Sequence, residues 1–130
     1  MNVIRKMQGS AYPVYNVDTQ KNLNLNLLYL NTIVENLGNN VLINNLTTKK
    51  IVVTNLFITA LEHNYNHYLI AKLKSDTIDF YSFYIYEKYF NISVFFTKDL
   101  EPKTLNGEDL ILNLNYATNL GISLQYYYED

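Results

Sequence analysis

Apolar and polar residues alternate along much of the chain, and the longest such run covers residues 51–60. This run is rich in β-branched side chains, which favour strands. Successive side chains of a strand point to opposite faces of a sheet. We therefore predict that one face carries Val52, Thr54, Leu56 and Ile58, and that the other carries Ile51, Val53, Asn55, Phe57 and Thr59.

Shorter runs of the same kind predict further strands, separated by polar or turn-forming residues. The predicted strands are residues 41–43, 67–73, 77–89, 91–97, 109–115 and 122–128. The predicted breaks are residues 38–40, 62–66, 74–76, 99–103, the Asn106-Gly107 pair and residues 117–121. Hairpin pairing is the natural arrangement around residues 67–73. About seven to nine short antiparallel strands predict an all-β fold, a single β-sandwich or jelly-roll-like domain.

Residues 22–37 fit two periods at once. The alternation of Asn and Leu places Leu23, Leu25 and Leu27 on one face of a strand. A helical spacing also connects Leu23, Leu27, Leu30, Val34 and Leu37, with Gly38 as the residue that follows the helix. We favour the strand, because asparagine side chains compete for backbone hydrogen bonds inside a helix. The helix remains the alternative.

The N-terminal segment, residues 1–21, is predicted to be an extended arm or edge strand ahead of a sandwich domain at residues 22–130. Its patterned part is residues 12–17, where Pro13 lacks the amide hydrogen that a central strand needs. An arm of this kind can pair with a neighbouring subunit. A poorly ordered terminus is the other interpretation.

Composition narrows the classes of partner. The chain has 130 residues, 48% of them hydrophobic, which suits one folded domain. Its net charge of -2 and pI near 5.6 give no reason to expect nucleic-acid binding. We find no run of eighteen apolar residues and no signal-peptide pattern, so no membrane partner is expected. The chain has 0 cysteines, which suits a reducing cell interior.

The titratable residues do not form a recognisable catalytic or metal-binding pattern. His63 and His67 have helical metal-ligand spacing beside Glu62, but they lie where a polar loop enters a predicted strand. Acidic residues are predicted to lie in solvated turns: Asp76, Asp79, Asp99, Glu101, Glu108, Asp109, Glu129 and Asp130. Neither a glycosidase pair nor a calcium loop nor a serine nucleophile elbow is evident. We therefore predict a protein that is not an enzyme, with no cofactor and no metal site.

Asparagine and tyrosine are unusually common, with 13 Tyr and 0 Trp. An AT-rich genome explains part of this bias, and both residue types also suit contact surfaces. The aromatic residues between Phe80 and Phe96 are predicted to line the sandwich core at alternate positions, with a platform for carbohydrate or bases as the alternative. Tyrosines that point outward are then candidates for a subunit interface. The glycosylation triplets at Asn45 and Asn91 are attributed to chance.

Three stretches carry a resemblance to a known group of proteins: residues 49–59, residues 105–110 and residues 121–129. They follow one another as a β-branched strand, a Gly-Asp type of turn and a closing aromatic strand with an acidic end. In this order, residues 41–130 resemble small phage virion accessory proteins. Glu108 is inserted between Gly107 and Asp109, and the first forty residues do not take part in the resemblance.

This resemblance implies a structural role in a virion, as a head decoration, head fibre, neck or tail component assembled in the host cytoplasm. It implies other virion proteins as partners and a homo-oligomeric state, and it implies no catalytic residues. The alternative function is a β-sandwich binding module for carbohydrate or for a host protein.

Overall fold

The structure is a computed structural model that describes residues 26–61, 68–87 and 89–130. Within these ranges lie eight β-strands and one short 3-10 helix, η1. In chain order they are β1 (Leu28–Val34), β2 (Gly38–Ile43), β3 (Lys50–Ala60), β4 (Leu69–Lys74), β5 (Asp79–Ile85), β6 (Asn91–Phe95), η1 (Lys98–Leu100), β7 (Leu110–Leu114) and β8 (Leu120–Glu129). The predicted all-β fold is confirmed.

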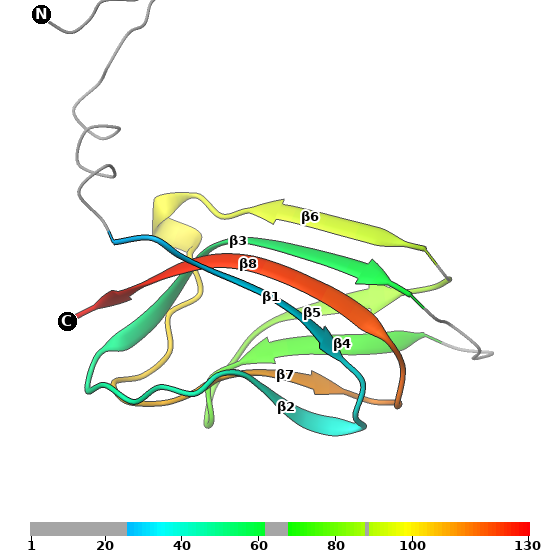
Figure 1. The fold of residues 1–130 in the computed structure, drawn as a ribbon, viewed down its shortest axis with the longest axis horizontal. Helices are drawn as coiled ribbons and strands as arrows, with labels where there is room; N and C mark the ends of the chain where they lie inside the picture. Colours follow the sequence, from blue (N-terminus) through cyan, green and yellow to red (C-terminus); the bar gives the residue numbers. More distant parts are fainter. Residues whose placement is uncertain (1–25, 62–67, 88) are drawn as a thin grey trace, which may run out of the picture.

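The strands form two four-stranded antiparallel sheets that face each other (Figure 1). Sheet A has the order β1-β8-β3-β6, and sheet B has the order β2-β7-β4-β5. The first strand pairs with the last, the second with the seventh, the third with the sixth and the fourth with the fifth. This nested pairing is that of one long hairpin rolled into two layers. It is the arrangement of an eight-stranded jelly roll.

Most predicted strands are present, but two predicted connections need correction. Gly38 and Asn40 belong to β2 and not to a turn, because they pair with Leu114 and Leu112 of β7. The Nδ2 group of Asn40 donates to Asn36 O at 2.8 Å. The side chain of Asn40 thus bonds to the preceding turn while its backbone is already in the strand. Likewise, Leu120 and Gly121 already belong to β8.

Residues 28–34 form a strand, so the helical alternative is wrong for this part of the chain. Leu23 and Leu25, like the predicted arm at residues 1–21, lie outside the described residues. The hairpin of β4 and β5 is confirmed. No hairpin joins β3 to β4 among the described residues, because these strands lie in different sheets and the chain crosses between the layers.

A β-bulge at Thr54 changes which side of β3 faces the core. The register with β8 shifts between Val53 and Asn55, so one extra residue separates the two halves of the strand. Ile51 and Val53 therefore join Leu56 and Ile58 in the core. The predicted separation of these residues onto opposite faces is wrong, because a strict period of two does not continue through a bulge.

The centre of the core is aliphatic, whereas alternate aromatic residues were predicted to line it. The largest fully buried side chains are Ile51, Val52, Leu56, Ile58, Leu69, Leu73, Ile85, Leu110, Leu112, Leu114, Leu120 and Ile122. Aromatic side chains such as Phe83 and Phe96 are only partly buried against this cluster. The reason is topological: β5 and β6 are edge strands. Their rings close the open side of the sandwich, where Tyr81 and Phe96 lie 5.1 Å apart.

Candidate functional site

The strand register defines three rows of side chains on the outer face of sheet A, three positions on each of its four strands. The first row joins Phe95, Asn55, Gln125 and Tyr29; the second joins Ser93, Phe57, Ser123 and Asn31; the third joins Asn91, Thr59, Gly121 and Ile33. We call these twelve residues the outer A face. None of them is buried. Their neighbours along each strand point to the core, as Leu56, Ile58, Ile122 and Leu124 do.

The outer A face carries no charged residue. The whole chain has 17% charged residues, so about two would be expected among twelve positions. The outside of sheet B provides an internal comparison, because Lys72, Lys74 and Asp79 lie there and Lys72 pairs with Asp79 at 3.5 Å. Charge is therefore absent from the twelve positions of the outer A face, whereas Lys50 and Glu129 lie on the same side of sheet A beyond the bulge. Depletion of charge is typical of the central part of protein interfaces.

Large apolar side chains project from the same face. Tyr29 is 69% exposed, Phe95 68%, Ile33 56% and Phe57 37%. The rings of Phe57 and Phe95 make an edge-to-face contact with centroids 5.5 Å apart. An exposed apolar cluster with a polar surround is a common mark of an interaction surface.

Several polar side chains of the outer A face are already hydrogen-bonded within it. Gln125 Nε2 donates to Tyr29 Oη at 2.8 Å, and Thr54 Oγ1 donates to Gln125 Oε1 at 2.9 Å. Ser123 Oγ donates to Asn31 Oδ1 in the middle row. Covering these groups leaves their mutual hydrogen bonds in place, so the cost of removing water from them is small.

Gly121 lines a hollow of about 490 Å³ in this face, together with residues that include Ile33, Phe57 and Thr59. Its backbone does not require glycine, because only Gly38 and Gly107 among the described glycines have positive φ. A methyl group added at Gly121 would meet no atom closer than 3.9 Å. Glycine inside a strand often marks a place where another molecule approaches closely. The hollow is shallow and open, and the missing side chain of Gly121 adds to its depth.

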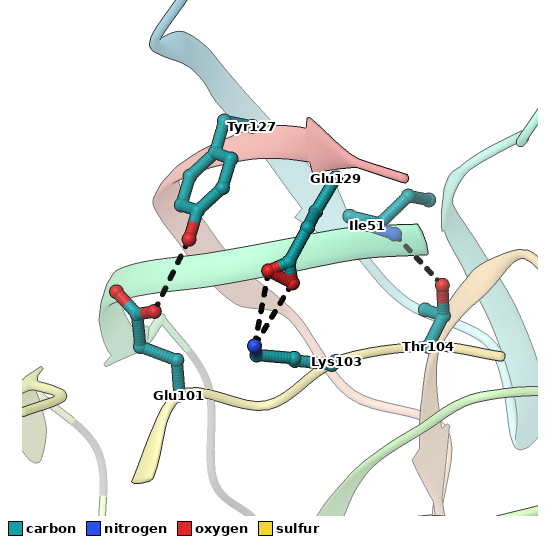
Figure 2. Close-up of polar contacts among 6 residues, drawn as sticks. All are labelled: Ile51, Glu101, Lys103, Thr104, Tyr127 and Glu129. Atoms are coloured by element: carbon teal, nitrogen blue, oxygen red, sulfur yellow. Dashed lines mark hydrogen bonds and ion pairs between the residues drawn. The ribbon is translucent and has the colours of Figure 1, made fainter. Parts of the chain in front are cut away.

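A second hollow of about 560 Å³ lies where the bulge opens β3, lined by Thr54, Phe95, Lys98, Glu101 and Tyr127 among others. Figure 2 shows the segment that bounds it, with Glu101 beside Tyr127 and Lys103 beside Glu129. Tyr127 Oη donates to Glu101 Oε1 at 3.4 Å, and Lys103 Nζ lies 2.9 Å from Glu129 Oε2. Polar and aromatic groups therefore share one concave site.

Burial has the largest effect on the pKa values of Glu101 and Tyr127, which face each other in this second hollow. It raises the pKa of the Glu101 carboxyl above its ordinary value, against the opposing effects of the Tyr127 hydrogen bond and Lys103. Burial, helped by the negative charge of Glu101, raises the pKa of Tyr127 to about 12. Tyr127 is therefore a neutral hydrogen-bond donor at neutral pH.

The two acidic residues that follow the Asn106-Gly107 turn, Glu108 and Asp109, form hydrogen bonds to neighbouring loops. Glu108 Oε1 accepts from Ser75 Oγ at 2.6 Å and from Thr77 N at 3.3 Å, and these bonds lower the pKa of Glu108. Asp109 Oδ1 accepts from Asn45 N at 2.7 Å. These contacts join three loops at one end of the sandwich. The inserted residue of the resemblance, Glu108, thus has a structural role here.

The prediction of solvated turns is wrong for Asp79 and Glu129, which lie in β5 and β8 because each forms an ion pair beside its strand, Asp79 with Lys72 at 3.5 Å and Glu129 with Lys103 at 2.9 Å. Asp130 lies 3.5 Å from Lys49. Within the described ranges, no group of three His, Cys, Asp or Glu residues could hold a metal ion. His63 and His67, and Glu62 beside them, lie outside these ranges. No helix in the described part of the chain is long and apolar enough to cross a bilayer.

The two glycosylation triplets differ in their surroundings. Asn45 is 8% exposed, and its Nδ2 donates to Lys49 O at 2.9 Å and to Glu108 O at 3.1 Å. Its Oδ1 accepts from the amide and hydroxyl groups of Thr47. Asn45 is therefore a structural residue, since an attached sugar would break this network. Asn91 is exposed at the end of the outer A face.

Outward tyrosines also gather on sheet B. Tyr68 contacts Tyr86 and Tyr84 edge to face, with ring centroids 4.6 Å and 6.2 Å apart. Tyr84 and Tyr86 are exposed near the edge strand β5 of sheet B, so they belong to the outward tyrosines that were predicted as interface candidates without being named. The outer A face was not predicted, because its members come from four strands that are distant in sequence.

Comparison with known protein families found no family that matches the chain, and comparison with curated proteins found no matching protein.

Proposed function

We propose that this protein is a non-enzymatic structural component of a virus particle of the phage type, an accessory capsid, neck or tail protein. It acts by protein–protein assembly, and the outer A face is its main contact surface. The observation that carries the proposal is that this face lacks charge while the opposite outer face has it. A charge-free face can be covered without leaving an ion unpaired in the interface.

The fold is compatible with this role by analogy. Jelly rolls occur in viral capsids, although they also occur in lectins and enzymes, so the fold alone does not assign a function. The resemblance of residues 41–130 to virion accessory proteins adds a second line of support. A rigid double sheet that presents one flat, uncharged face suits a protein that takes repeated positions on a particle.

The test is quantitative mass spectrometry of density-purified particles of the virus whose genome encodes the chain. We expect a fixed copy number relative to the major capsid protein. A particle assembled with Ser93→Glu, which places a charge in the outer A face, should lose the protein. Particles with Ser82→Glu, the matched change on an edge strand of sheet B, should retain it. Absence of the unaltered protein from purified particles, with normal amounts in the infected cell, would contradict the proposal.

The second hollow supports a second candidate function, a binding module for carbohydrate. Phe95 offers a ring for stacking against a sugar, and Lys98, Glu101 and Gln125 offer polar groups around it. Its volume of about 560 Å³ is within the usual range for small-ligand sites.

A nuclear magnetic resonance titration with defined oligosaccharides tests this candidate. Binding through the hollow should shift the amide signals of residues 95–101 and 125–127, and Glu101→Gln should weaken it at least tenfold. The substitution Lys72→Gln on the outside of sheet B is the control and should have no effect. Signals that do not move at millimolar sugar concentrations would exclude carbohydrate as the ligand of this hollow.

A further inference from the structure

The outer A face combines a cavity and projecting side chains on one surface. The hollow over Gly121 lies in the third row, on β8, whereas Phe95 projects from the first row, on β6. Strand spacing and rise per residue put these positions about 17 Å apart, so Phe95 does not fill the hollow of its own chain. A surface that has both features can be complementary to a second copy of itself.

Two-fold symmetry provides the required match. When two identical faces meet around a two-fold axis in the interface plane, residue i of one copy contacts residue j of the other, and the reverse contact forms as well. An axis midway between Phe95 and Gly121 therefore places each Phe95 over the partner's hollow. The contact closes on itself and gives a dimer.

The absence of charge on the outer A face is also compatible with a second copy of the chain as the partner. The chain carries a net charge of -2, so two copies repel each other only weakly. Within the outer A face no ionic group is buried when the copies meet, and its polar side chains keep hydrogen bonds such as that between Gln125 and Tyr29. A basic or acidic partner would find no complementary charge on this face.

The size of the face determines the expected strength. Four strands about 4.8 Å apart and five residues of about 3.4 Å each give a patch of roughly 330 Å² in projection. Stable complexes usually bury about 800 Å² on each partner, so this contact lies below their range and is expected to be transient in solution. Copies held side by side on a particle would gain from their high local concentration.

We propose that two copies of the chain associate through their outer A faces, with Phe95 of each copy inserted into the Gly121 hollow of the other. This inference rests on the proposed function in one respect, since it takes the same face as the assembly surface. It adds that the partner on this face is a second copy of the chain.

The test is sedimentation equilibrium of the full chain from about 10 µM to about 1 mM, the range in which a small interface associates. We expect the average mass to rise from monomer toward dimer. Gly121→Val should shift the association at least tenfold toward the monomer, because it fills the hollow. A Cβ added at Gly121 would meet no atom closer than 3.9 Å and a β-branched residue suits a strand, so the same substitution should maintain the melting temperature. A maintained melting temperature would show that loss of association is not caused by unfolding.

Two serines provide a matched pair of charge variants. Ser93 and Ser82 are both exposed and both lie on edge strands, but Ser93 is in the outer A face and Ser82 pairs with Lys72 on sheet B. Ser93→Glu should abolish the dimer, and Ser82→Glu should leave it unchanged. A dimer that persists in both Gly121→Val and Ser93→Glu would show that another surface is responsible.

The outcomes separate this inference from the proposed function. A chain that stays monomeric at 1 mM overturns self-association. If Ser93→Glu nevertheless removes that chain from particles, the outer A face binds a different virion protein and the proposed function stands. If the chain dimerises through this face but is absent from purified particles, self-association holds and the virion role is wrong.

Discussion

Ile51 and Thr104 exchange two hydrogen bonds alongside the first half of β3. The amide of Ile51 donates to Thr104 Oγ1 at 2.8 Å (Figure 2), and the amide of Thr104 donates to Ile51 O at 2.9 Å. Pro102 O accepts from the amide of Val53 at 3.0 Å in the same segment. β6 pairs only with the second half of β3, from Asn55 to Thr59. Residues 102–104 thus replace β6 beyond the bulge and satisfy buried backbone groups there.

Replacing Thr104 with valine should destabilise the protein by about 1–3 kcal/mol, because the buried amide of Ile51 loses its acceptor while the side-chain shape is kept. Chemical denaturation measures the change in the free energy of unfolding. Thr48→Val at an exposed position is the control and should stay within about 0.5 kcal/mol. Equal effects of the two substitutions would show that the Thr104 hydroxyl has no special role.

Asn45 and Asn91 have the same glycosylation triplet but should respond differently to alanine. Asn45→Ala should cost about 2 kcal/mol or more, because it removes the hydrogen bonds that a buried side chain makes to Lys49 O, Glu108 O and Thr47 N. Asn91→Ala should stay within about 0.5 kcal/mol, since Asn91 is exposed on an edge strand. Thermal unfolding of both variants measures the difference. A tolerant Asn45 would contradict the structural role assigned to its side chain.

Tyr127 should make the protein sensitive to alkali. Its pKa is raised from 10.0 to about 12 in the folded chain, so the unfolded chain releases this proton first as pH rises. The stability that the protonated Tyr127 contributes to the folded protein is fully present below pH 10 and is lost as pH rises from 10 through about 12. The free energy of unfolding is measured against pH for Tyr127→Phe and for the unaltered protein. The difference between the two curves isolates the contribution of Tyr127. A difference that does not vary with pH in this window would refute the assignment.

Deletion of Thr54 should prevent folding. Without the extra residue, the side chains before and after the bulge can no longer share the core face, so Ile51 and Val53 point outward or Leu56 and Ile58 do. Thr54→Ala keeps the backbone and should cost far less. Circular dichroism and solubility of the two variants distinguish the outcomes. A folded deletion variant would mean that the bulge can move elsewhere along β3.

Strand positions could be predicted because alternation and turn residues are local properties. The strand at residues 51–60 and the Asn106-Gly107 turn are confirmed, with Gly107 at a φ of 76°. The bulge could not be predicted, because an inserted residue leaves the local pattern β-branched throughout. Gly121 looked like part of a turn, since glycine in a sequence usually marks one. Only the position of β8 inside sheet A shows that this glycine lines a hollow.

The outer A face was hidden for a related reason. Each strand contributes three residues to this face. Three uncharged residues at alternate positions of one strand are common in this sequence. Their common property emerges only after β1, β8, β3 and β6 are placed side by side. The aromatic residues were misassigned to the centre of the core because periodicity gives a side chain's face but not its distance from the sheet edge.

The nested order of the strands also affects when the protein can fold. Leu28 pairs with Tyr126, and β8 lies between β1 and β3, so sheet A cannot form until residues 120–129 have been synthesised. Contacts so distant in sequence slow folding, because a long loop must close before they form. A nascent chain on the ribosome has no outer A face. Neighbouring chains on one messenger RNA are thereby kept from associating through this face before each has completed its own fold.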